Sequence, residues 1–215
     1  AVRLHGVRAT TLGLGPQVVY RAKHLRQRDA SIALLCTVAC LFALCACKND
    51  EVSEIPEGML KAGGDSNDYY FYYDNSWTLQ TASAGTDSAE IMIKPAADNS
   101  GISPNASLSV VAFSLTSEKK NYTVSDQWKE YRAELENAFP EFTYDESKDE
   151  EIRLDDAPAS KKRYNITIGD NTYTFIQVLC IRYANVYQIT FTCLENEFEA
   201  RSGIVDKVIN NFHFR

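Results

Sequence analysis

The sequence predicts a mixed α/β (α+β) domain, a three-layer α/β/α sandwich in which helices cover both faces of an antiparallel sheet. Short runs of aromatic and β-branched residues, separated by turn residues, indicate strands. Two segments with apolar residues at helical spacing indicate helices. The strands in the second half of the chain are apolar on both faces, so water can cover neither face. Helices on each side of one sheet satisfy all three observations.

The expected strands form two groups. Before the first helix they are Tyr69–Tyr73, Trp77–Ala82, Ala89–Lys94 and Leu108–Leu115. After it they are Lys161–Ile168, Tyr173–Arg182 and Val186–Leu194. Tight turns at Gly169-Asp170-Asn171 and at Ala184-Asn185 join the last three strands into hairpins.

The first expected helix runs from Thr123 to Phe139. Its apolar stripe consists of Val124, Trp128, Tyr131, Leu135 and Ala138. Thr123, with Asp126 three residues later, predicts the N-cap, and Pro140 ends the helix. The second expected helix covers residues 197–210, with Asn196 as its cap. Its stripe consists of Phe198, Val205, Val208, Ile209 and Phe212.

Alternation along the last three strands assigns their side chains to two faces of the sheet. The first face takes Ile176, Val178, Cys180, Ile189, Phe191 and Cys193. The second face takes Tyr164, Ile166, Ile168, Tyr173, Phe175, Leu179 and Ile181. Because both sets are apolar, the two amphipathic helices are expected to cover one face each.

Residues 1–46 have the layout of a secretory signal peptide with an extra N-terminal extension. The segment Ala30–Ala46 has no charged residue in 17 positions. The stretch before it carries Arg21, Lys23, Arg26 and Arg28 against Asp29. A helix needs roughly 20 apolar residues to span a bilayer, so an uncleaved transmembrane anchor is the alternative. Residues 1–20 are excluded from the fold prediction.

The end of the charge-free run favours a lipoprotein signal over an uncleaved anchor or an ordinary signal peptide with a cysteine-rich apolar region. Leu44-Cys45-Ala46-Cys47 resembles the bacterial lipobox, with Leu three residues before the cut and a small residue just before it. The resemblance implies that the Cys47 thiol takes a diacylglyceryl group. We therefore expect residues 47–68 to be the lipidated cysteine with a flexible tether, and residues 69–215 to be the globular domain. The expected address is the outer face of the plasma membrane in the bacterial cell envelope.

Charge limits the partners of the exported part. Residues 1–46 hold six basic residues and one acidic residue, which leaves 16 basic and 28 acidic residues and a net charge of −12. Such a surface repels nucleic acid and anionic lipid headgroups. We therefore expect no nucleic-acid partner, and membrane attachment through the lipid anchor only.

The order of motifs over residues 69–215 resembles the PsbP-like family. The matching segments are Tyr73-Asp74-Asn75-Ser76-Trp77, Ser107–Leu115, Asp156-Ala157-Pro158-Ala159, Gln177, Tyr187–Phe191 and Ile209–Phe214. At Asn75-Ser76 the sequence departs from the Pro-x-Gly that is typical of the family. The family includes extrinsic photosystem II subunits, a small Ran-binding protein and many bacterial lipoproteins. The resemblance implies the same α/β/α sandwich and a binding or assembly role, and it carries over no catalytic residue set.

The exported part offers few groups for catalysis or metal binding. Its single histidine, His213, lies between Phe212 and Phe214, which indicates a β-like tail with His213 at the surface rather than a member of a triad. Besides Cys47, only His213, Cys180 and Cys193 could bind zinc. We therefore predict no catalytic residue, no cofactor and no metal site.

Two stretches have an unusual composition. Asp145–Asp156 has seven acidic residues in twelve but lacks the Asp-x-Asp-x-Asp-Gly pattern of a calcium loop. We interpret it as a solvated connection between helix and sheet, with weak divalent-cation binding as the alternative. Tyr69–Tyr73 is five aromatic residues in a row. We interpret it as a strand with one face in the core and the other covered or at a sheet edge; exposed rings that bind a sugar, a cell-wall glycan or a partner are the alternative.

Cys180 and Cys193 are predicted to be separate buried thiols. With Ala184 and Asn185 as the loop, Cys180 lies opposite Ile189, and Cys193 lies four residues out of register with Cys180. This offset is about 13 Å along the strands. A disulfide tolerates a Cα separation of only about 7 Å.

The function expected from the sequence is a non-catalytic binding or assembly module of unknown specificity. Its partner is a protein or another component of the cell envelope. One alternative is a surface glycan-processing hydrolase with paired carboxylates. The other is a transporter-associated ligand-binding lipoprotein, which requires a deep pocket with converging polar groups.

Overall fold

A computed structural model describes residues 54–80, 90–97 and 105–215. The helices are α1 (Val124–Ala138), α2 (Phe198–Arg201) and α3 (Gly203–Asn210), with short 3-10 turns η1 (Glu146–Lys148) and η2 (Glu195–Glu197). The strands are β1 (Met59–Ala62), β2 (Tyr69–Asp74), β3 (Trp77–Gln80), β4 (Ile91–Pro95), β5 (Ala106–Ser114), β6 (Phe142–Tyr144), β7 (Glu150–Leu154), β8 (Ala157–Ile168), β9 (Asn171–Arg182), β10 (Asn185–Leu194) and β11 (Phe212–Phe214). The predicted mixed α+β class is confirmed.

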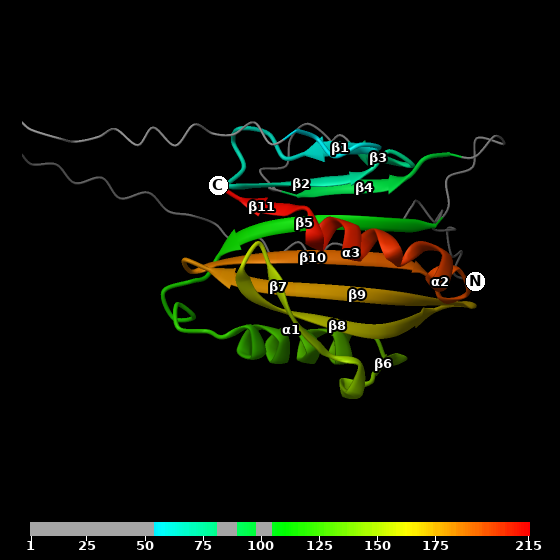
Figure 1. Ribbon diagram of the computed structural model, residues 1–215. Coiled ribbons are helices and arrows are strands. Elements are labelled where there is room, and N and C mark those ends of the chain that lie inside the picture. The colour runs from blue at the N-terminus through cyan, green and yellow to red at the C-terminus, as the bar shows by residue number, and fades with distance from the viewer. Residues whose placement is uncertain (1–53, 81–89, 98–104) are drawn as a thin grey trace, which may run out of the picture. The chain divides into compact units, whose positions relative to one another are not determined.

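The strands form two antiparallel sheets rather than the single sheet that was predicted. The large sheet has eight strands in the order β3-β4-β5-β10-β9-β8-β6, and β7 also pairs with β8. The small sheet has the order β1-β2-β11. Figure 1 shows the long strands β5, β10, β9 and β8 side by side in this order.

Each face of the large sheet has its own hydrophobic cluster, with the division of side chains that alternation predicted. Trp128 and Leu135 of α1 pack over the second face, among residues such as Phe175. The first face packs against α2, α3 and the small sheet, through side chains such as Val208 and Phe71. The layer over the first face is therefore part helix and part sheet, a mixture that the sequence did not predict.

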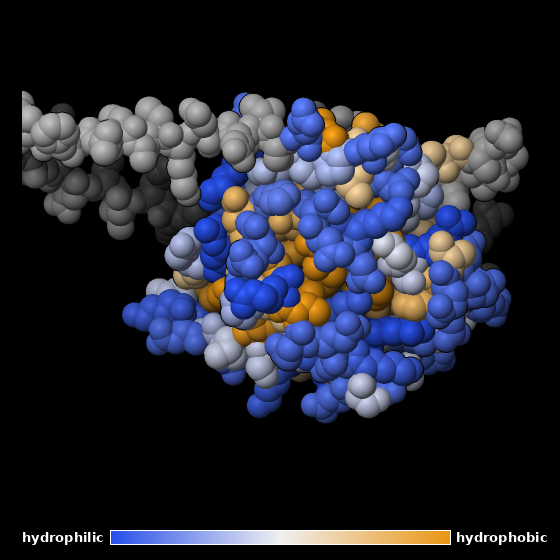
Figure 2. Space-filling view, viewed as in Figure 1, coloured by the Kyte–Doolittle hydropathy of each residue, from blue (hydrophilic) through white to orange (hydrophobic). Residues whose placement is uncertain are grey.

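Figure 2 shows that hydrophilic side chains cover most of the face seen in Figure 1 and that a hydrophobic area remains visible in its middle. Partly buried hydrophobic residues pack against the first cluster: Ile91, Ala112, Ile152, Ala157 and Phe214. The cover of the first face thus leaves these five hydrophobic residues only partly buried.

Helix α1 begins and ends where its sequence predicts. The Thr123 side chain accepts from the backbone N–H of Asp126, and the Asp126 side chain accepts from the backbone N–H of Thr123, which is a complete capping box. The helix ends at Ala138, and Phe139 is its C-cap, directly before Pro140. Ala138, which was placed on the apolar stripe, is exposed.

The second predicted helix is interrupted. It consists of η2, α2 and α3, with a break at Ser202. Asn196 is not its cap, because it lies inside η2 and Leu194 precedes that turn without a side-chain cap. Val205 and Val208 are buried, as expected.

The β9–β10 hairpin has a different register from the one predicted. Its two turn residues are Tyr183 and Ala184, with φ of 51° and 61°, and Arg182 pairs with Asn185. Cys180 therefore lies opposite Tyr187 rather than Ile189. The pairing is displaced by two positions, which leaves every side chain on its predicted face because strands alternate with a period of two.

Three short strands lie where the sequence predicted a tether or a connection. Met59–Ala62, inside the expected tether 47–68, forms β1 and pairs with β2. The folded part therefore extends before residue 69. The acidic run Asp145–Asp156 contains η1 and β7, and β6 precedes it, so the run pairs with the sheet and is more than a connection. Its acidic side chains apart from Asp149 are exposed, so the prediction that they are solvated holds.

Candidate functional site

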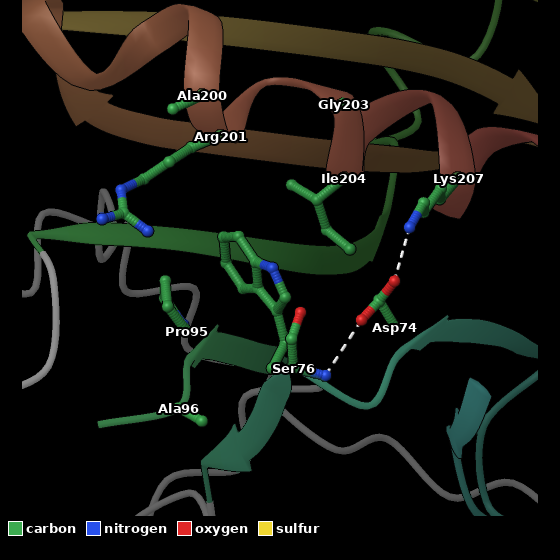
Figure 3. A pocket seen from close by; sticks show the side chains of 10 residues that line it. Asp74, Ser76, Pro95, Ala96, Ala200, Arg201, Gly203, Ile204 and Lys207 are labelled. Carbon is green, nitrogen blue, oxygen red and sulfur yellow. Dashed lines mark hydrogen bonds and ion pairs between the residues drawn. The ribbon is translucent and has the colours of Figure 1, made fainter. Parts of the chain in front are cut away.

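A cleft lies where the turn between β2 and β3 and the end of β4 face the α2–α3 segment (Figure 3). We call it the Trp77 cleft. Its volume is about 330 Å³, and its polar and aromatic lining residues are Asp74, Ser76, Trp77, Arg201 and Lys207. Figure 3 shows Ile204 and Lys207 extending from α3 toward the turn that carries Asp74 and Ser76.

The turn that presents Trp77 is set by local hydrogen bonds. The Asp74 side chain accepts from the backbone N–H of Ser76 at 2.9 Å, which closes an Asx-type turn. The Ser76 carbonyl accepts from the backbone N–H of Ala96 at 2.8 Å, and Trp77 pairs with Pro95 across the sheet. The indole is consequently held at the start of β3 and is buried.

The charged groups of the Trp77 cleft are paired. Lys207 of α3 donates to Asp74 at the end of β2 (Figure 3). This hydrogen bond and, to a smaller extent, those from Ser76 hold the pKa of Asp74 far below its usual range. Arg201 donates to Glu197 at 2.6 Å. Since Asp74 stays ionised, it has no proton to donate near neutral pH.

His213 lies in β11, away from the lining of the Trp77 cleft. Its side chain is 37% exposed, and its Nδ1 is 3.8 Å from Oδ1 of Asp155. Its ring stacks on Tyr70 with a centroid distance of 5.0 Å. Among the described residues, no hydroxyl or thiol hydrogen-bonds to His213, so the structure assembles no triad around it there.

The aromatic run in β2 belongs mainly to the core. Tyr69, Phe71 and Tyr73 are buried in the first hydrophobic cluster. Tyr72 on the opposite side is also buried, and Tyr70 is half-buried beside His213. The interpretation of this run as a strand covered on both faces agrees with these positions.

Carboxylates of the acidic run take donors from the protein itself. Asp145 caps η1, Asp149 accepts from Lys162 at 2.5 Å, and Asp155 accepts from the backbone N–H of Phe214 at 2.7 Å. The part of the chain that the structure describes contains no group of three or more His, Cys, Asp or Glu residues placed to hold a metal ion.

The structure describes Cys180 and Cys193 but not Cys47. Cys47, the expected lipidation site, lies outside the described residues. Cys180 and Cys193 are buried and free, as predicted, and burial raises the pKa of each thiol to about 11. In the described ranges no helix is long and apolar enough to cross a membrane, and Ala30–Ala46 is outside those ranges.

The sequence identified only part of the Trp77 cleft. Tyr73 to Trp77 was noted as a motif, and Asp74 two residues before Ser76 is a spacing typical of an Asx turn. Nothing in the sequence pairs Asp74 with Lys207, because 133 positions separate them.

The strand order, the two clusters and the flanking helices define a PsbP-like fold. The solved structure of the cyanobacterial PsbP protein CyanoP, from Synechocystis sp. PCC 6803, is similar with a TM-score of 0.53 and 13% identity, over 74% of this chain and 93% of that chain. The Ran-binding protein Mog1p of Saccharomyces cerevisiae is similar with a TM-score of 0.52 and 7% identity, over 73% and 95%. LpqN of Mycobacterium tuberculosis, described as involved in cell envelope biogenesis, is similar with a TM-score of 0.50 and 15% identity, over 72% and 90%.

These likenesses concern the fold alone. No family model matches the sequence, and no curated protein matches it either.

Proposed function

We propose that this chain is a non-catalytic binding or assembly module, held by a lipid on Cys47 at the outer face of the plasma membrane of a bacterial cell envelope. The observation that carries the anchor is Leu44-Cys45-Ala46-Cys47 directly after the charge-free run Ala30–Ala46 and its basic flank. In this proposal residues 1–46 are removed and the domain is displayed outside the cell. Its partner is a protein or another envelope component rather than nucleic acid, because the mature charge is −12.

The binding role is supported by the fold and by the Trp77 cleft. Of the structures with this fold, one is a Ran-binding protein and another is involved in cell envelope biogenesis. The cleft is lined by the largely buried Trp77 indole and by two cations that already have carboxylate partners, Arg201 and Lys207. Trp and Arg are enriched among the residues that carry most of the energy in protein interfaces.

Within the Trp77 cleft, the hydrolase alternative is disfavoured by the state of Asp74, the one carboxylate among its described lining residues. A glycosidase needs one carboxyl group with a raised pKa to protonate the leaving group. In the Trp77 cleft, Asp74 is bound to Lys207 and its pKa is lowered. A ligand-binding lipoprotein remains the second candidate, because pockets for small ligands occupy roughly 300–1,000 Å³ and the Trp77 cleft, at about 330 Å³, falls within that range.

The anchor is tested by intact-mass analysis of the protein extracted from membranes. The mature chain should begin at Cys47 and carry a diacylglyceryl group, and Cys47→Ala should lose both the lipid and the cleavage. Cys45→Ala is the matched control, since it keeps a small residue at that position and should still be processed. A mature N-terminus at any other residue would disprove the anchor.

The binding role is tested in cells by a photo-crosslinking phenylalanine analogue. At Ala200, which lines the Trp77 cleft, it should form a discrete covalent adduct with an envelope component. At Lys129, an exposed position on α1, it should form none. Equal adducts from both positions, or none from Ala200, would argue against binding at this cleft.

A further inference from the structure

A second and larger hollow lies along the outer edge of β8. We call it the Arg163 cavity. Its volume is about 550 Å³, and it shares only Gly203 with the lining of the Trp77 cleft. Its walls come from β8, from the η1–β7 segment and from the α2–α3 segment.

The cavity arises from a gap in the strand pairing. On its outer side, β8 pairs with β7 as far as Lys161, opposite Glu150, and pairs with β6 from Tyr164, opposite Tyr144. The positions between these registers have no strand partner on that side among the described residues, because the chain leaves the sheet there to form η1. Lys162 and Arg163 therefore lie at an opening in the sheet edge.

Two of the three cations in this stretch are neutralised by carboxylates. Lys161 is 3.0 Å from a carboxylate oxygen of Asp206 and 3.3 Å from one of Glu150. Lys162 is 2.5 Å from a carboxylate oxygen of Asp149. These lysines hold the cavity walls together and have little remaining attraction for a ligand.

Arg163 is held differently. Its guanidinium carbon lies 3.8 Å from the centroid of the Phe198 ring. Within the described part of the chain, no carboxylate lies at ion-pair distance from it, and it donates no hydrogen bond to the protein. Stacking occupies the face of a guanidinium and leaves its N–H edge available for an oxyanion, which that planar fork can bind through two parallel hydrogen bonds.

We propose that the Arg163 cavity binds a small ligand through a single carboxylate group. Arg163 donates hydrogen bonds to this carboxylate while its guanidinium stacks on the Phe198 ring. The acidic lining residues disfavour ligands that carry more than one negative charge. Glu199 and Asp206 lie on the same walls and would repel a phosphate dianion or a polyanion more strongly than a monoanion. The carboxylate comes from a peptide C-terminus or from a sugar acid, and the two sources share the chemistry that Arg163 recognises.

The test is isothermal titration calorimetry on the detergent-solubilised full chain. The probes are N-acetyl-dialanine and glucuronate, each compared with its neutral amide, and inorganic phosphate. We expect at least one of the two acids to bind and its amide to bind about tenfold more weakly or not at all. Whichever acid binds more tightly identifies the source as a peptide C-terminus or a sugar acid.

Two test variants and one control variant connect the binding to the cavity. Arg163→Gln should weaken the acid by about tenfold. Arg182→Gln is the matched control, since Arg182 also stacks on an aromatic ring, that of Phe214, but does not line the cavity. Glu199→Gln should tighten binding of the acid, a change that misfolding cannot produce.

Three results would overturn the proposal. Acids and amides could bind equally or not at all to the folded protein, Arg182→Gln could weaken binding as much as Arg163→Gln, or phosphate could bind more tightly than either acid. None of these outcomes depends on the lipid on Cys47, so the proposed anchor and this site succeed or fail separately.

Discussion

Gly63→Ala should unfold the start of the domain, although Gly63 lies in a segment whose composition predicts a tether. Gly63 has φ of +98°, and a Cβ added there would stand 2.7 Å from the Tyr69 carbonyl oxygen and 2.9 Å from the Tyr70 Cα. The left-handed backbone costs an alanine about 1–2 kcal/mol. Displacing the backbone of β2 adds about 1–3 kcal/mol. We therefore expect the free energy of unfolding to fall by about 3 kcal/mol.

The assay is urea denaturation followed by tryptophan fluorescence. With a slope of about 2 kcal/mol per molar, the transition midpoint should fall by about 1.5 M. Gly64→Ala is the control, because a Cβ at Gly64 meets nothing within 4 Å, and its midpoint should stay close to that of the unsubstituted chain. Equal midpoints for the two variants would mean that residues 59–68 form a tether after all, and that β1 does not contribute to stability.

Two further predictions follow from burial. Burial raises the pKa values of Cys180 and Cys193 to about 11, so a thiol reagent at pH 8 should label neither thiol in the folded Cys47→Ala form of residues 47–215. After denaturation without reductant, the reagent should label both thiols. If it labels neither after denaturation, the two cysteines form a disulfide. Burial and, to a smaller extent, the hydrogen bond to Asp68 raise the pKa of Tyr187 to about 12. A raised folded-state pKa gives stability that is complete below the unfolded value near 10 and is lost as pH rises toward 12. Urea midpoints should therefore fall between pH 10 and 12, and less steeply in Asp68→Asn; an unchanged slope in that variant would contradict the role of this bond.

The sequence predicts α1 to the residue because every signal for it is local. The capping box needs only Thr123 and Asp126, the stripe needs only helical spacing, and Pro140 ends the helix. A prediction from short-range patterns is accurate where the structure is decided at short range.

The β9–β10 hairpin shows the opposite case. Its turn places Tyr183 and Ala184 in the left-handed region, where Asn and Gly are preferred, so turn chemistry pointed to the neighbouring pair instead. The assignment of side chains to faces was still right, because the shift was an even number of residues. Turn preference alone therefore did not identify this register.

The short edge strands could not be recognised from composition. Met59–Ala62 has only four residues and no alternation, and β7 lies inside an acidic run. Both become strands because a longer strand, β2 or β8, offers a free edge. Edge strands rich in charge are common, since charge discourages pairing with another molecule.

The two hollows share a cause in the last helical segment. Phe198, Val205 and Val208 form its buried stripe, which the spacing predicted. Glu199, Ser202 and Asp206 line the Arg163 cavity, while Ala200, Ile204 and Lys207 line the Trp77 cleft. The two lining sets each recur at intervals of three or four residues, so each lies along one side of the helical segment. The core shares residues with both linings, because Ile204 is also buried and Phe198 also lines the Arg163 cavity. The two sides that flank the buried stripe are therefore divided between two proposed binding sites, and Gly203 lies on the boundary between them.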